Sequence, residues 1–392
     1  MDRRRGQPCE SHQTTGPEIA DKPLNLLFVI VDLYGGAGVY CKILATGLKR
    51  FADRPVRTHL MTFRSPEMSD EDTLLFDQIT KLDLPVHTDW RRSFETVRDI
   101  RRLTDAIDSA QSDLIVSIGT YANLLVPYVA PKRKIILTEH VHLSGRLNES
   151  KSRVVLPKLI RWRYPGRPVV VPSQGAADDL RDRYGLDDVR VIPHGIDAER
   201  VLRLAEETPD DLPKHPYMVA AGRLVPQKDY PTMLTAYAEA HGRAIKTDLL
   251  ILGAGSQLPA LEALAGKLGI GGNVKFAGFV QNPYPYLKHA QALVLSSVYE
   301  GFGLAILEAM TLGTPCISTD CPSGPAEILG NGEFGLLVPP RDPHALANAM
   351  LELVSFPAKR QILVDKALRR ADELSLSAMT TRYLALFDEV LG

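Results

Sequence analysis

Short apolar runs recur along the chain and alternate with longer stretches in which apolar residues repeat at helical spacing. Such runs, rich in valine, isoleucine and leucine, are typical of strands buried on both faces of a parallel sheet. The first half of the chain contains six predicted strands: 26–31, 58–63, 114–118, 135–138, 169–171 and 189–192. The second half contains six more: 217–221, 249–252, 274–276, 292–295, 316–319 and 335–338.

The alternation of strands with helical stretches, such as 38–51 and 303–312, indicates doubly wound α/β domains. Residues 198–216 contain three prolines and an acidic cluster, a composition typical of a linker. A chain of 392 residues is also too long for one ordinary core. We therefore predict two Rossmann-like domains facing each other across a cleft. We place an arm outside the fold at 1–22, the first domain at 23–200, a linker at 201–216 and the second domain at 217–372.

Composition excludes several classes of protein. With 45% hydrophobic and 24% charged residues, the chain has the composition of a soluble globular protein, and its net charge of −1 argues against a nucleic-acid partner. Its four cysteines have no metal-ligand spacing, which favours a reducing compartment and no metal site. The early apolar run 24–31 is too short to span a bilayer, and residues 1–22 lack the apolar segment of a secretory signal. We predict a cytoplasmic protein.

Two carboxylates, Glu300 and Glu308, flank a Gly-Phe-Gly turn that leads into an apolar helical stretch. Glycines let backbone N–H groups approach a ligand closely, and a helix N-terminus favours an anion. Glu300 would lie in the loop and Glu308 two turns into the helix, so that they could bind different hydroxyls of one elongated polar ligand. The alternative is a buried strand-to-helix turn with one glutamate at the helix N-terminus and the other solvated.

Two further segments are suited to phosphate. Gly36 and Gly38 follow the first predicted strand and precede a helix, and Arg223 and Lys228 lie five residues apart in a turn after the strand 217–221. Backbone N–H groups at a helix start and a pair of cations can both hold a diphosphate. The first segment also comes close to a dinucleotide-binding Gly-x-Gly-x-x-Gly pattern, with Asp53 downstream, but Cys41 replaces the last glycine and Asp53 precedes the second strand.

Other candidate residues follow strand ends, where open parallel sheets bind their ligands. His140 and His142 follow the strand 135–138, and either could hydrogen-bond a hydroxyl, although a lone histidine is more often structural. Gly253 follows the strand 249–252, and Phe279 and Val280 follow the strand 274–276. Each of these glycine turns, taken alone, is also compatible with an ordinary strand end.

Together these segments resemble the retaining glycosyltransferases of family 4, the glycosyl transferases group 1, over about residues 24–390. The resemblance implies the GT-B fold, with residues 373–392 forming a helix that packs back on the first domain. It also implies a catalytic group of His140, Glu300, Arg223 and Lys228. The donor site would comprise Gly36, Gly38, Arg223, Lys228, Gly253, Phe279, Val280, Glu300, Gly301, Phe302, Gly303, Leu304 and Glu308.

Within this resemblance, Arg223 and Lys228 hold the donor phosphates, His140 and Glu300 contact the donor sugar, and Glu308 contacts the ribose. The implied reaction moves a sugar from a nucleotide diphosphate sugar, a UDP-sugar or GDP-mannose, with retention of configuration through same-face chemistry. None of the motif segments named above contains an Asp-x-Asp motif, so we expect neither a metal nor another cofactor. A nucleotide-sugar epimerase and an NAD-binding oxidoreductase are the alternative classes.

The acceptor is expected to be a saccharide or a polyprenyl-diphosphate-linked saccharide made for the cell surface, with a soluble small molecule as the alternative. Residues 131–170 contain ten basic and only two acidic residues. Within them, 151–163 combines lysines and arginines with apolar residues and Trp162. A basic and apolar surface of this kind can rest on an anionic bilayer, although a core-facing helix with a solvated basic side has the same pattern. We therefore consider peripheral contact with the inner face of the cytoplasmic membrane.

Overall fold

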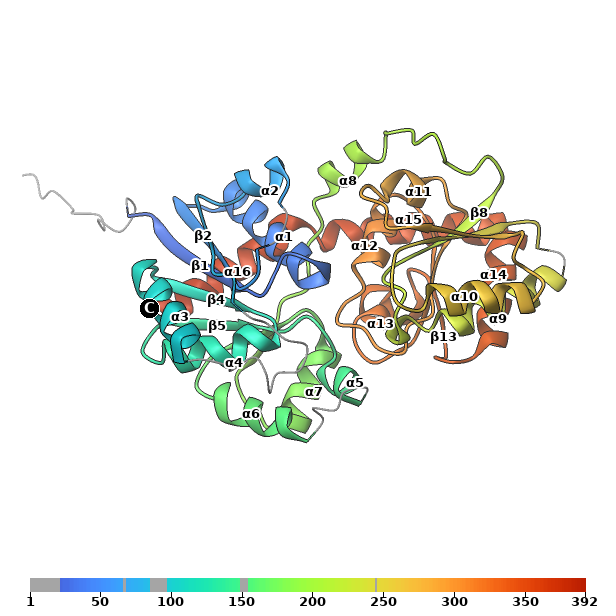
Figure 1. Cartoon of the computed structure of the whole chain (residues 1–392). Helices are drawn as coiled ribbons and strands as arrows, with labels where there is room; N and C mark the ends of the chain where they lie inside the picture. The colour runs from blue at the N-terminus through green and yellow to red at the C-terminus, as the bar shows by residue number, and fades with distance from the viewer. Residues whose placement is uncertain (1–21, 66–67, 85–96, 149–153, 244) are drawn as a thin grey trace, which may run out of the picture.

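The computed structural model describes residues 22–65, 68–84, 97–148, 154–243 and 245–392. The chain forms two lobes, coloured blue to green and yellow to orange in Figure 1. Apart from Lys22, the predicted arm at 1–22 lies outside the described residues.

The first lobe is built on a seven-stranded parallel sheet with the order β3-β2-β1-β4-β5-β6-β7. Its strands are β1 (Leu24–Ile30), β2 (Val56–Thr62), β3 (Gln78–Lys81), β4 (Leu114–Ile118), β5 (Ile135–Thr138), β6 (Val169–Val171) and β7 (Val189–Val191). Its helices are α1 (Gly35–Phe51), α2 (Asp70–Leu74), α3 (Val97–Ser109), α4 (Thr120–Val129), α5 (Leu143–Asn148), α6 (Val155–Arg163) and α7 (Gln174–Tyr184).

The second lobe is built on a six-stranded parallel sheet with the order β10-β9-β8-β11-β12-β13. Its strands are β8 (Tyr217–Ala221), β9 (Asp248–Leu252), β10 (Val274–Gly278), β11 (Leu293–Leu295), β12 (Cys316–Thr319) and β13 (Leu336–Val338). The helical elements from α8 onward are α8 (Ala198–Leu204), the 3₁₀ turns η1 (Pro226–Lys228) and η2 (Gly330–Gly332), α9 (Tyr230–Gly242), α10 (Leu258–Lys267), α11 (Tyr284–Lys288), α12 (Leu304–Thr311), α13 (Pro325–Ile328), α14 (Pro343–Ser355), α15 (Pro357–Glu373) and α16 (Leu376–Leu391).

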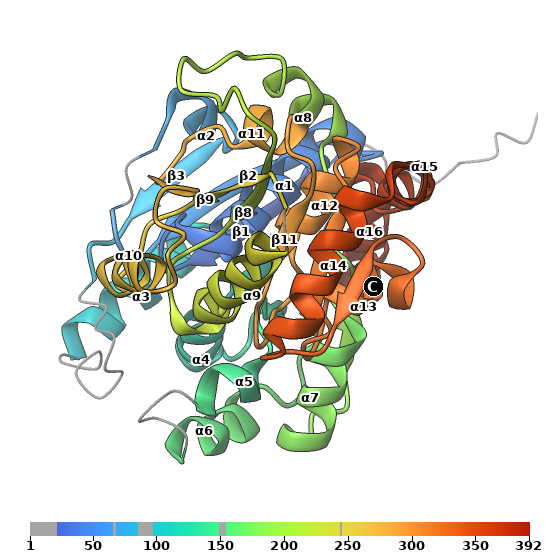
Figure 2. The ribbon, with the colours of Figure 1, turned by 90° about the vertical axis from the view of Figure 1, so that its right-hand side faces the viewer.

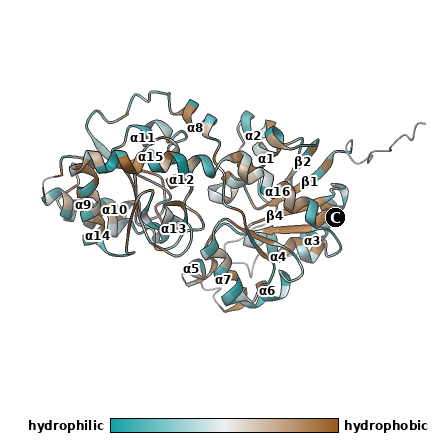
Figure 3. Ribbon diagram, turned by 180° about the vertical axis from the view of Figure 1, so that it is seen from behind, coloured by the Kyte–Doolittle hydropathy of each residue, from teal (hydrophilic) through white to brown (hydrophobic). Residues whose placement is uncertain are grey.

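Both sheets are enclosed by helices, which is why their strands are apolar on both faces. In β1, for example, Phe28 and Val29 are fully buried although they point to opposite faces of the sheet. Figure 3 shows the same pattern as apolar strands under helices of mixed polarity. In the second lobe α9 and α14 pack against each other, as the turned view in Figure 2 also shows. The predicted fold class, two Rossmann-like α/β domains, is confirmed.

All twelve apolar runs form strands, but the sequence prediction missed β3. This strand, Gln-Ile-Thr-Lys, pairs only with β2 at the edge of the sheet, and none of its residues is fully buried. An edge strand needs no continuous apolar run, because one side of it faces solvent.

The chain crosses between the lobes twice, and the two crossings are hydrogen-bonded to each other. Ile196 N–H donates to the Leu374 carbonyl, and Leu376 N–H donates to the Ile196 carbonyl. The sequence predicts the first domain boundary after residue 200. In the structure α8 instead packs against α11 and α12, and its Val201 belongs to the core of the second lobe.

The terminal helix α16 packs on the first lobe, although it follows the last helix of the second lobe. Its Met379, Tyr383 and Phe387 are buried in a core shared with β1 and α1. The Tyr40 hydroxyl of α1 donates to the Tyr383 hydroxyl at 2.7 Å. Figure 1 shows this red helix beside the blue elements. The C-terminus therefore stabilises the first lobe and not the second.

Candidate active site

A cavity of about 600 Å³ lies between the two lobes. From the first lobe it is lined by the loops after β1, β5 and β7 and by α5. From the second lobe it is lined by the loops after β8 and β11 and by the start of α12. These loops follow the carboxyl ends of parallel strands, the edge at which open α/β sheets bind ligands. Of the candidate residues, those that line it are Gly36, His140, Arg223, Lys228, Glu300, Gly301, Phe302, Gly303 and Leu304.

Glu300 and Lys228 form an ion pair at the cavity wall. Lys228 Nζ lies 2.5 Å from Glu300 Oε1, and the Ser297 hydroxyl donates to the same oxygen at 2.6 Å. Gln227 Nε2 donates a long hydrogen bond of 3.5 Å to Glu300 Oε2. Glu300 is buried, and a buried charge is stabilised only when it is paired and hydrogen-bonded. The second lobe therefore holds a carboxylate and an ammonium in fixed positions beside the cavity.

Arg223 adds a second, exposed cation to the same wall. It precedes the 3₁₀ turn η1 (Pro226–Lys228), which is followed by Asp229, a residue with a left-handed backbone (φ 46°). Gly253 supports this turn from the next strand, because a Cβ at Gly253 would lie 1.9 Å from the Gly222 carbonyl oxygen. Gly253 therefore shapes the turn that carries Arg223 and does not line the cavity itself.

The Gly-Phe-Gly turn brings the two lobes into contact. A Cβ at Gly301 would lie 1.9 Å from the His140 carbonyl oxygen, so only glycine allows these two loops to approach so closely. Gly303 has φ 105°, which a residue with a side chain rarely adopts, and it directly precedes α12. Phe302 is buried between them, and its carbonyl leaves no room for a Cβ at Gly324.

The opposite wall combines packed, uncharged rings with the exposed Arg146 of α5. His140 lies with its ring centroid 4.1 Å from that of Tyr40 and 5.3 Å from that of His194. Burial lowers the pKa of His140 well below its usual value, with His194 adding to the effect, and burial lowers the pKa of His194 to about 3. His140 Nε2 bonds the Thr138 hydroxyl at 2.9 Å. Both imidazoles are therefore neutral at physiological pH.

A buried carboxylate lies directly behind His140. Glu139 accepts hydrogen bonds from the Thr120 hydroxyl (2.9 Å), from Asn123 Nδ2 (2.9 Å) and from the Tyr164 hydroxyl (2.5 Å). Burial raises the pKa of Glu139, and these three donors oppose the rise. The network ties β5 to α4 and to the end of α6, so it fixes the strand end that carries His140.

Gly36 and Gly38, in the first turn of α1, have different roles. Gly36 lines the cavity, with open space where a Cβ would be. Gly38 lies below the surface, where a Cβ would be 2.0 Å from the Leu33 carbonyl oxygen. Gly38 thus permits the tight connection between β1 and α1. Asp53, the residue that a dinucleotide site would need, precedes β2 and so lies at the opposite end of the sheet from this loop.

Three further candidates do not line the cavity. Glu308 is half-buried on α12 and accepts a 3.4 Å hydrogen bond from the Tyr284 hydroxyl. Burial raises the pKa of Glu308 to about 7, although Tyr284 and Arg200 oppose the shift. Phe279 has 80% of its surface exposed, and Val280 packs against the core of the second lobe. Their assignment to a donor site stays a prediction.

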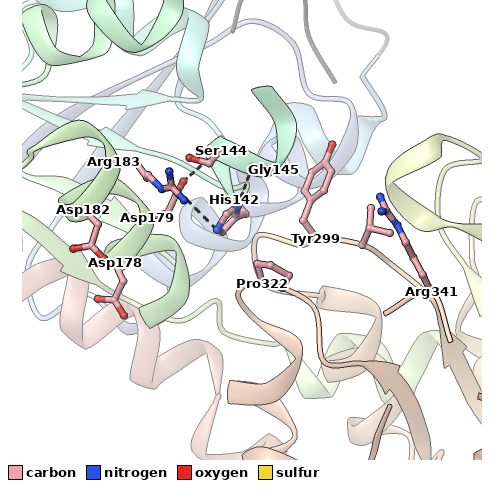
Figure 4. Close-up of a pocket in the computed structure, with 11 residues that line it drawn as sticks. His142, Ser144, Gly145, Asp178, Asp179, Asp182, Arg183, Tyr299, Pro322 and Arg341 are labelled. Carbon is pink, nitrogen blue, oxygen red and sulfur yellow. Dashed lines mark hydrogen bonds and ion pairs between the residues drawn. The ribbon is translucent and has the colours of Figure 1, made fainter. Parts of the chain in front are cut away.

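A second pocket, of about 570 Å³, adjoins the cavity at Tyr299, a residue that lines both. Figure 4 shows Tyr299 among the residues of this second pocket. His142, the alternative to His140, lies here, where its Nδ1 accepts from Gly145 N–H at 3.0 Å and its Nε2 is 3.9 Å from Asp179. Burial is the main reason that the pKa of His142 is lowered. His142 belongs to this neighbouring pocket, and His140 lines the cavity.

The sequence analysis missed several residues of the cavity. His194 follows the strand β7, and Gln227 lies between the two predicted cations. Tyr299 directly precedes Glu300, and Arg146 is exposed on the short helix α5. A position next to a recognised motif could have indicated Gln227 and Tyr299. No local pattern marks Arg146, which reaches the cavity only through the tertiary fold.

Comparison with known proteins identifies the family. The family model described as Glycosyl transferases group 1 matches residues 206–370, and the one described as Glycosyltransferase Family 4 matches residues 34–200. An uncharacterized glycosyltransferase of Methanocaldococcus jannaschii is 30% identical over 303 residues, which cover 72% of this chain and 73% of that protein. The chain belongs to the family 4, group 1 glycosyltransferases. It is therefore a glycosyltransferase, as its motifs predict.

Other relatives in the family have more specific names. An N-acetylgalactosaminyltransferase of Campylobacter jejuni, named for a diphospho-undecaprenol-linked substrate, is 27% identical over 67% of this chain and 73% of its own length. The lipopolysaccharide core biosynthesis glycosyltransferase LpsE of Rhizobium meliloti is 31% identical over 56% of this chain and 63% of its own length.

Solved structures agree on the fold. Anabaena HepE in complex with UDP-glucose superposes with a TM-score of 0.77 at 19% identity, covering 93% of this chain and all of that chain. Similarity to such glycosyltransferase structures confirms the predicted GT-B fold.

Proposed function

We propose that this glycosyltransferase moves a sugar from a nucleotide diphosphate sugar to a saccharide or lipid-linked saccharide, with retention of configuration, in cell-surface polysaccharide or glycoconjugate synthesis. The donor we favour is a UDP-sugar, with GDP-mannose as the alternative. The observation that carries the proposal is the Lys228–Glu300 pair beside the exposed Arg223 in a cavity between the lobes. This arrangement combines cations for a diphosphate with a fixed carboxylate for sugar hydroxyls.

The proposed reaction follows from the positions of Arg223, Lys228 and Glu300 in the cavity. Charge builds up on the diphosphate as the bond to the sugar breaks, and Arg223 and Lys228 would stabilise it as prearranged cations. Glu300 would bind the sugar's hydroxyls. It is already held by Ser297 and Lys228, so it is poised to orient the donor sugar and not to attack it. The leaving phosphate oxygen would then accept the proton of the incoming hydroxyl on the same face of the sugar.

His140 and His194 complete the proposed reaction chamber from the first lobe. Because both imidazoles are neutral, they would contribute hydrogen bonding and shape without adding positive charge. Arg146 lies on the same wall and is exposed to the cavity, where an acceptor would enter.

A donor screen tests the proposal. Purified protein is incubated with a panel of UDP-, GDP- and dTDP-sugars, release of the nucleoside diphosphate is measured with and without EDTA, and the anomer of the released sugar is determined by NMR. We expect one donor class to be hydrolysed slowly, with retention, and at an unchanged rate in EDTA. An inverted product would contradict the proposed stereochemistry. Loss of turnover in EDTA that manganese or magnesium restores would contradict the cation clamp.

The acceptor side of the proposal rests on a surface of the first lobe. This α6 surface consists of Tyr128, Val154, Lys158, Trp162 and Arg163. Trp162 is 67% exposed and Val154 is 64% exposed, while Arg163 lies 3.6 Å from the Trp162 ring centroid and 4.5 Å from that of Tyr128. Exposed aromatic and basic side chains together suit the interface of an anionic bilayer. Residues 151–153 of the predicted segment lie outside the described residues.

None of the helices in the described part of the chain is long and apolar enough to cross a membrane. We propose peripheral contact through the α6 surface, which would bring the cavity to a polyprenyl-diphosphate-linked acceptor. The acceptors named for the Campylobacter relative support this choice. Vesicles with and without anionic lipid are sedimented with wild type, with Trp162→Ala/Lys158→Gln and with the control Lys267→Gln on α10. Equal binding by all three, or binding by none, would favour a soluble acceptor.

A further inference from the structure

A carboxylate of the second lobe caps a helix of the first. Glu327 on α13 accepts hydrogen bonds from Gln174 N–H at Oε2 (2.7 Å) and from Gly175 N–H at Oε1 (2.9 Å). These two amides begin α7, so they have no partner within the helix. A carboxylate at this position is also favoured by the helix dipole. Both oxygens of Glu327 are thus used in one contact between the lobes.

The surrounding backbone is packed closely. A Cβ at Gly175 would lie 2.9 Å from Ser323 Cα, and a side chain there would push the lobes apart. The Ser173 hydroxyl, next to this helix start, donates to the Gly301 carbonyl at 2.8 Å. In Figures 1 and 3, α7 and α13 lie on facing sides of the two lobes. The contact is therefore a direct one between the two domains.

The same contact reaches the cavity through a single loop. The Ser323 hydroxyl donates to the Glu300 carbonyl at 2.6 Å, and Glu300 N–H donates to the Pro322 carbonyl at 3.3 Å. From the first lobe, His142 N–H donates to the Glu300 carbonyl at 3.1 Å. The backbone of Glu300 is thus held by the loop that leads to Glu327 and by the loop that carries His140.

We propose that Glu327 is a positioning residue that latches the two lobes together and brings Glu300 against His140. The side chains that would hold the phosphates, Arg223 and Lys228, belong to the second lobe, and the first lobe would add backbone groups near Gly36. Nucleotide binding should therefore depend on the latch less than turnover does. In an open molecule water would solvate both the carboxylate and the two amides, so the latch is worth little net energy and can release. The turnover part of this inference rests on the proposed function, but the latch itself does not.

The test measures the distance between the lobes. Spin labels are placed at Asp187→Cys in the first lobe and Ala358→Cys in the second, both exposed positions. Cys9 is replaced by serine, and the other three cysteines are buried. The distance distribution is compared for wild type, Glu327→Ala, Glu327→Gln and the control Glu333→Ala. Glu333 lies on the same lobe, and its carboxylate forms an exposed ion pair with Lys366.

We expect Glu327→Ala to shift the distribution to longer distances and to speed hydrogen exchange at the Gln174 and Gly175 amides. Glu327→Gln, which keeps one acceptor oxygen, should lie between Ala and wild type, and Glu333→Ala should match wild type. With the donor from the screen, turnover of Glu327→Ala should fall about tenfold while the affinity for UDP or GDP changes less than about twofold.

Three results would overturn the latch: an unchanged distance distribution in Glu327→Ala, an equal shift in Glu333→Ala, or an equal loss of nucleotide affinity and turnover. Failure of the proposed function would look different. No donor would then turn over in wild type, while the distance measurement would still decide whether Glu327 joins the lobes.

Discussion

The two walls of the cavity differ in the charge of the buried side chains that form them. On the second lobe, Glu300 is buried with an ammonium 2.5 Å away, and Arg223 lies exposed beside it. On the first lobe, His140 and His194 stack with Tyr40 and remain neutral because burial lowers their pKa values. A ligand in this cavity would meet a fixed ion pair and Arg223 on one side, and neutral rings beside the exposed Arg146 on the other.

From this difference we infer which wall binds the diphosphate and which binds the sugar and the incoming hydroxyl. A diphosphate carries its charge at one end, so it is suited to the wall with cations. A sugar and an incoming hydroxyl are neutral, so they are suited to the part of the first-lobe wall where His140 and His194 offer hydrogen bonds and ring surfaces without charge. Substitutions on the charged wall should therefore have the largest effects, and those on the neutral wall should be smaller and independent of pH near neutrality.

The largest effect is expected for Glu300→Gln. The substitution keeps shape but removes the charge that Lys228 pairs with and the acceptor that we propose for the sugar's hydroxyls. Turnover should fall about a thousandfold, beyond the loss of a single oriented donor, while circular dichroism shows an intact fold. The surface substitution Glu333→Gln is the control. Near wild-type turnover in Glu300→Gln would remove this residue from the donor site.

Arg223→Ala and Lys228→Ala come next. Each removes a cation from the proposed diphosphate clamp, so each should lower kcat/KM by about a hundredfold, or about 3 kcal/mol. Lys275→Ala, which removes an exposed ion pair to Asp211 on the same lobe, is the matched control. If kcat/KM of the Arg223 or Lys228 variant matched that of the control, the charged wall would not be the phosphate side.

His140→Phe tests the neutral wall. Phenylalanine keeps the ring stacking with Tyr40 but removes the hydrogen-bonding nitrogens, so turnover should fall about tenfold. Because His140 is neutral well below pH 6.5, wild type and variant should have parallel rate profiles between about pH 6 and 8. A loss that appears only on one side of pH 6.5 would show that the imidazole titrates, and the contrast between the walls would then be wrong.

A smaller effect is expected for Glu308→Gln, with a fewfold rise in the KM for the donor and little change in kcat, because a ribose contact mostly binds ground and transition states equally. The wild-type KM should improve as pH rises through about 7, where Glu308 loses its proton, and the variant should lack this dependence. An unchanged KM at pH 8 would remove Glu308 from the donor site.

The smallest expected effect is on thermodynamic stability, which should depend on pH in opposite directions through Glu308 and His194. Glu308 has a higher pKa in the folded state than its usual 4.5, so it favours folding at low pH, and that stability is lost as pH rises toward 7. His194 has a lower pKa than its usual 6.5, so stability is lost as pH falls below about 6.5, by about 1 kcal/mol per pH unit. Urea unfolding from pH 5 to 8 should show slopes that Glu308→Gln and His194→Phe change in opposite directions.

Much of the second-lobe wall was predictable, because its residues lie in compact local motifs. The cations five residues apart and Glu300 beside a glycine turn each belong to one strand-to-helix connection. Such a connection places its residues at the carboxyl edge of the sheet whatever the rest of the fold does. The first-lobe wall is different, because Tyr40, His140 and His194 come from three distant segments and meet only by stacking.

The amino-acid sequence by itself determined the strand and helix alternation, the two-domain class, the family and the polar residues at the strand ends, because these depend on periodicity and on short motifs. Tertiary structure decided the rest. Burial is the main reason that the two histidines are neutral and that the pKa of Glu308 is raised to about 7. The approach of two lobes alone places Gly301 on His140 and Glu327 on the start of α7. Desolvation and long-range contact depend on every neighbour in space, and no local pattern of residues encodes them.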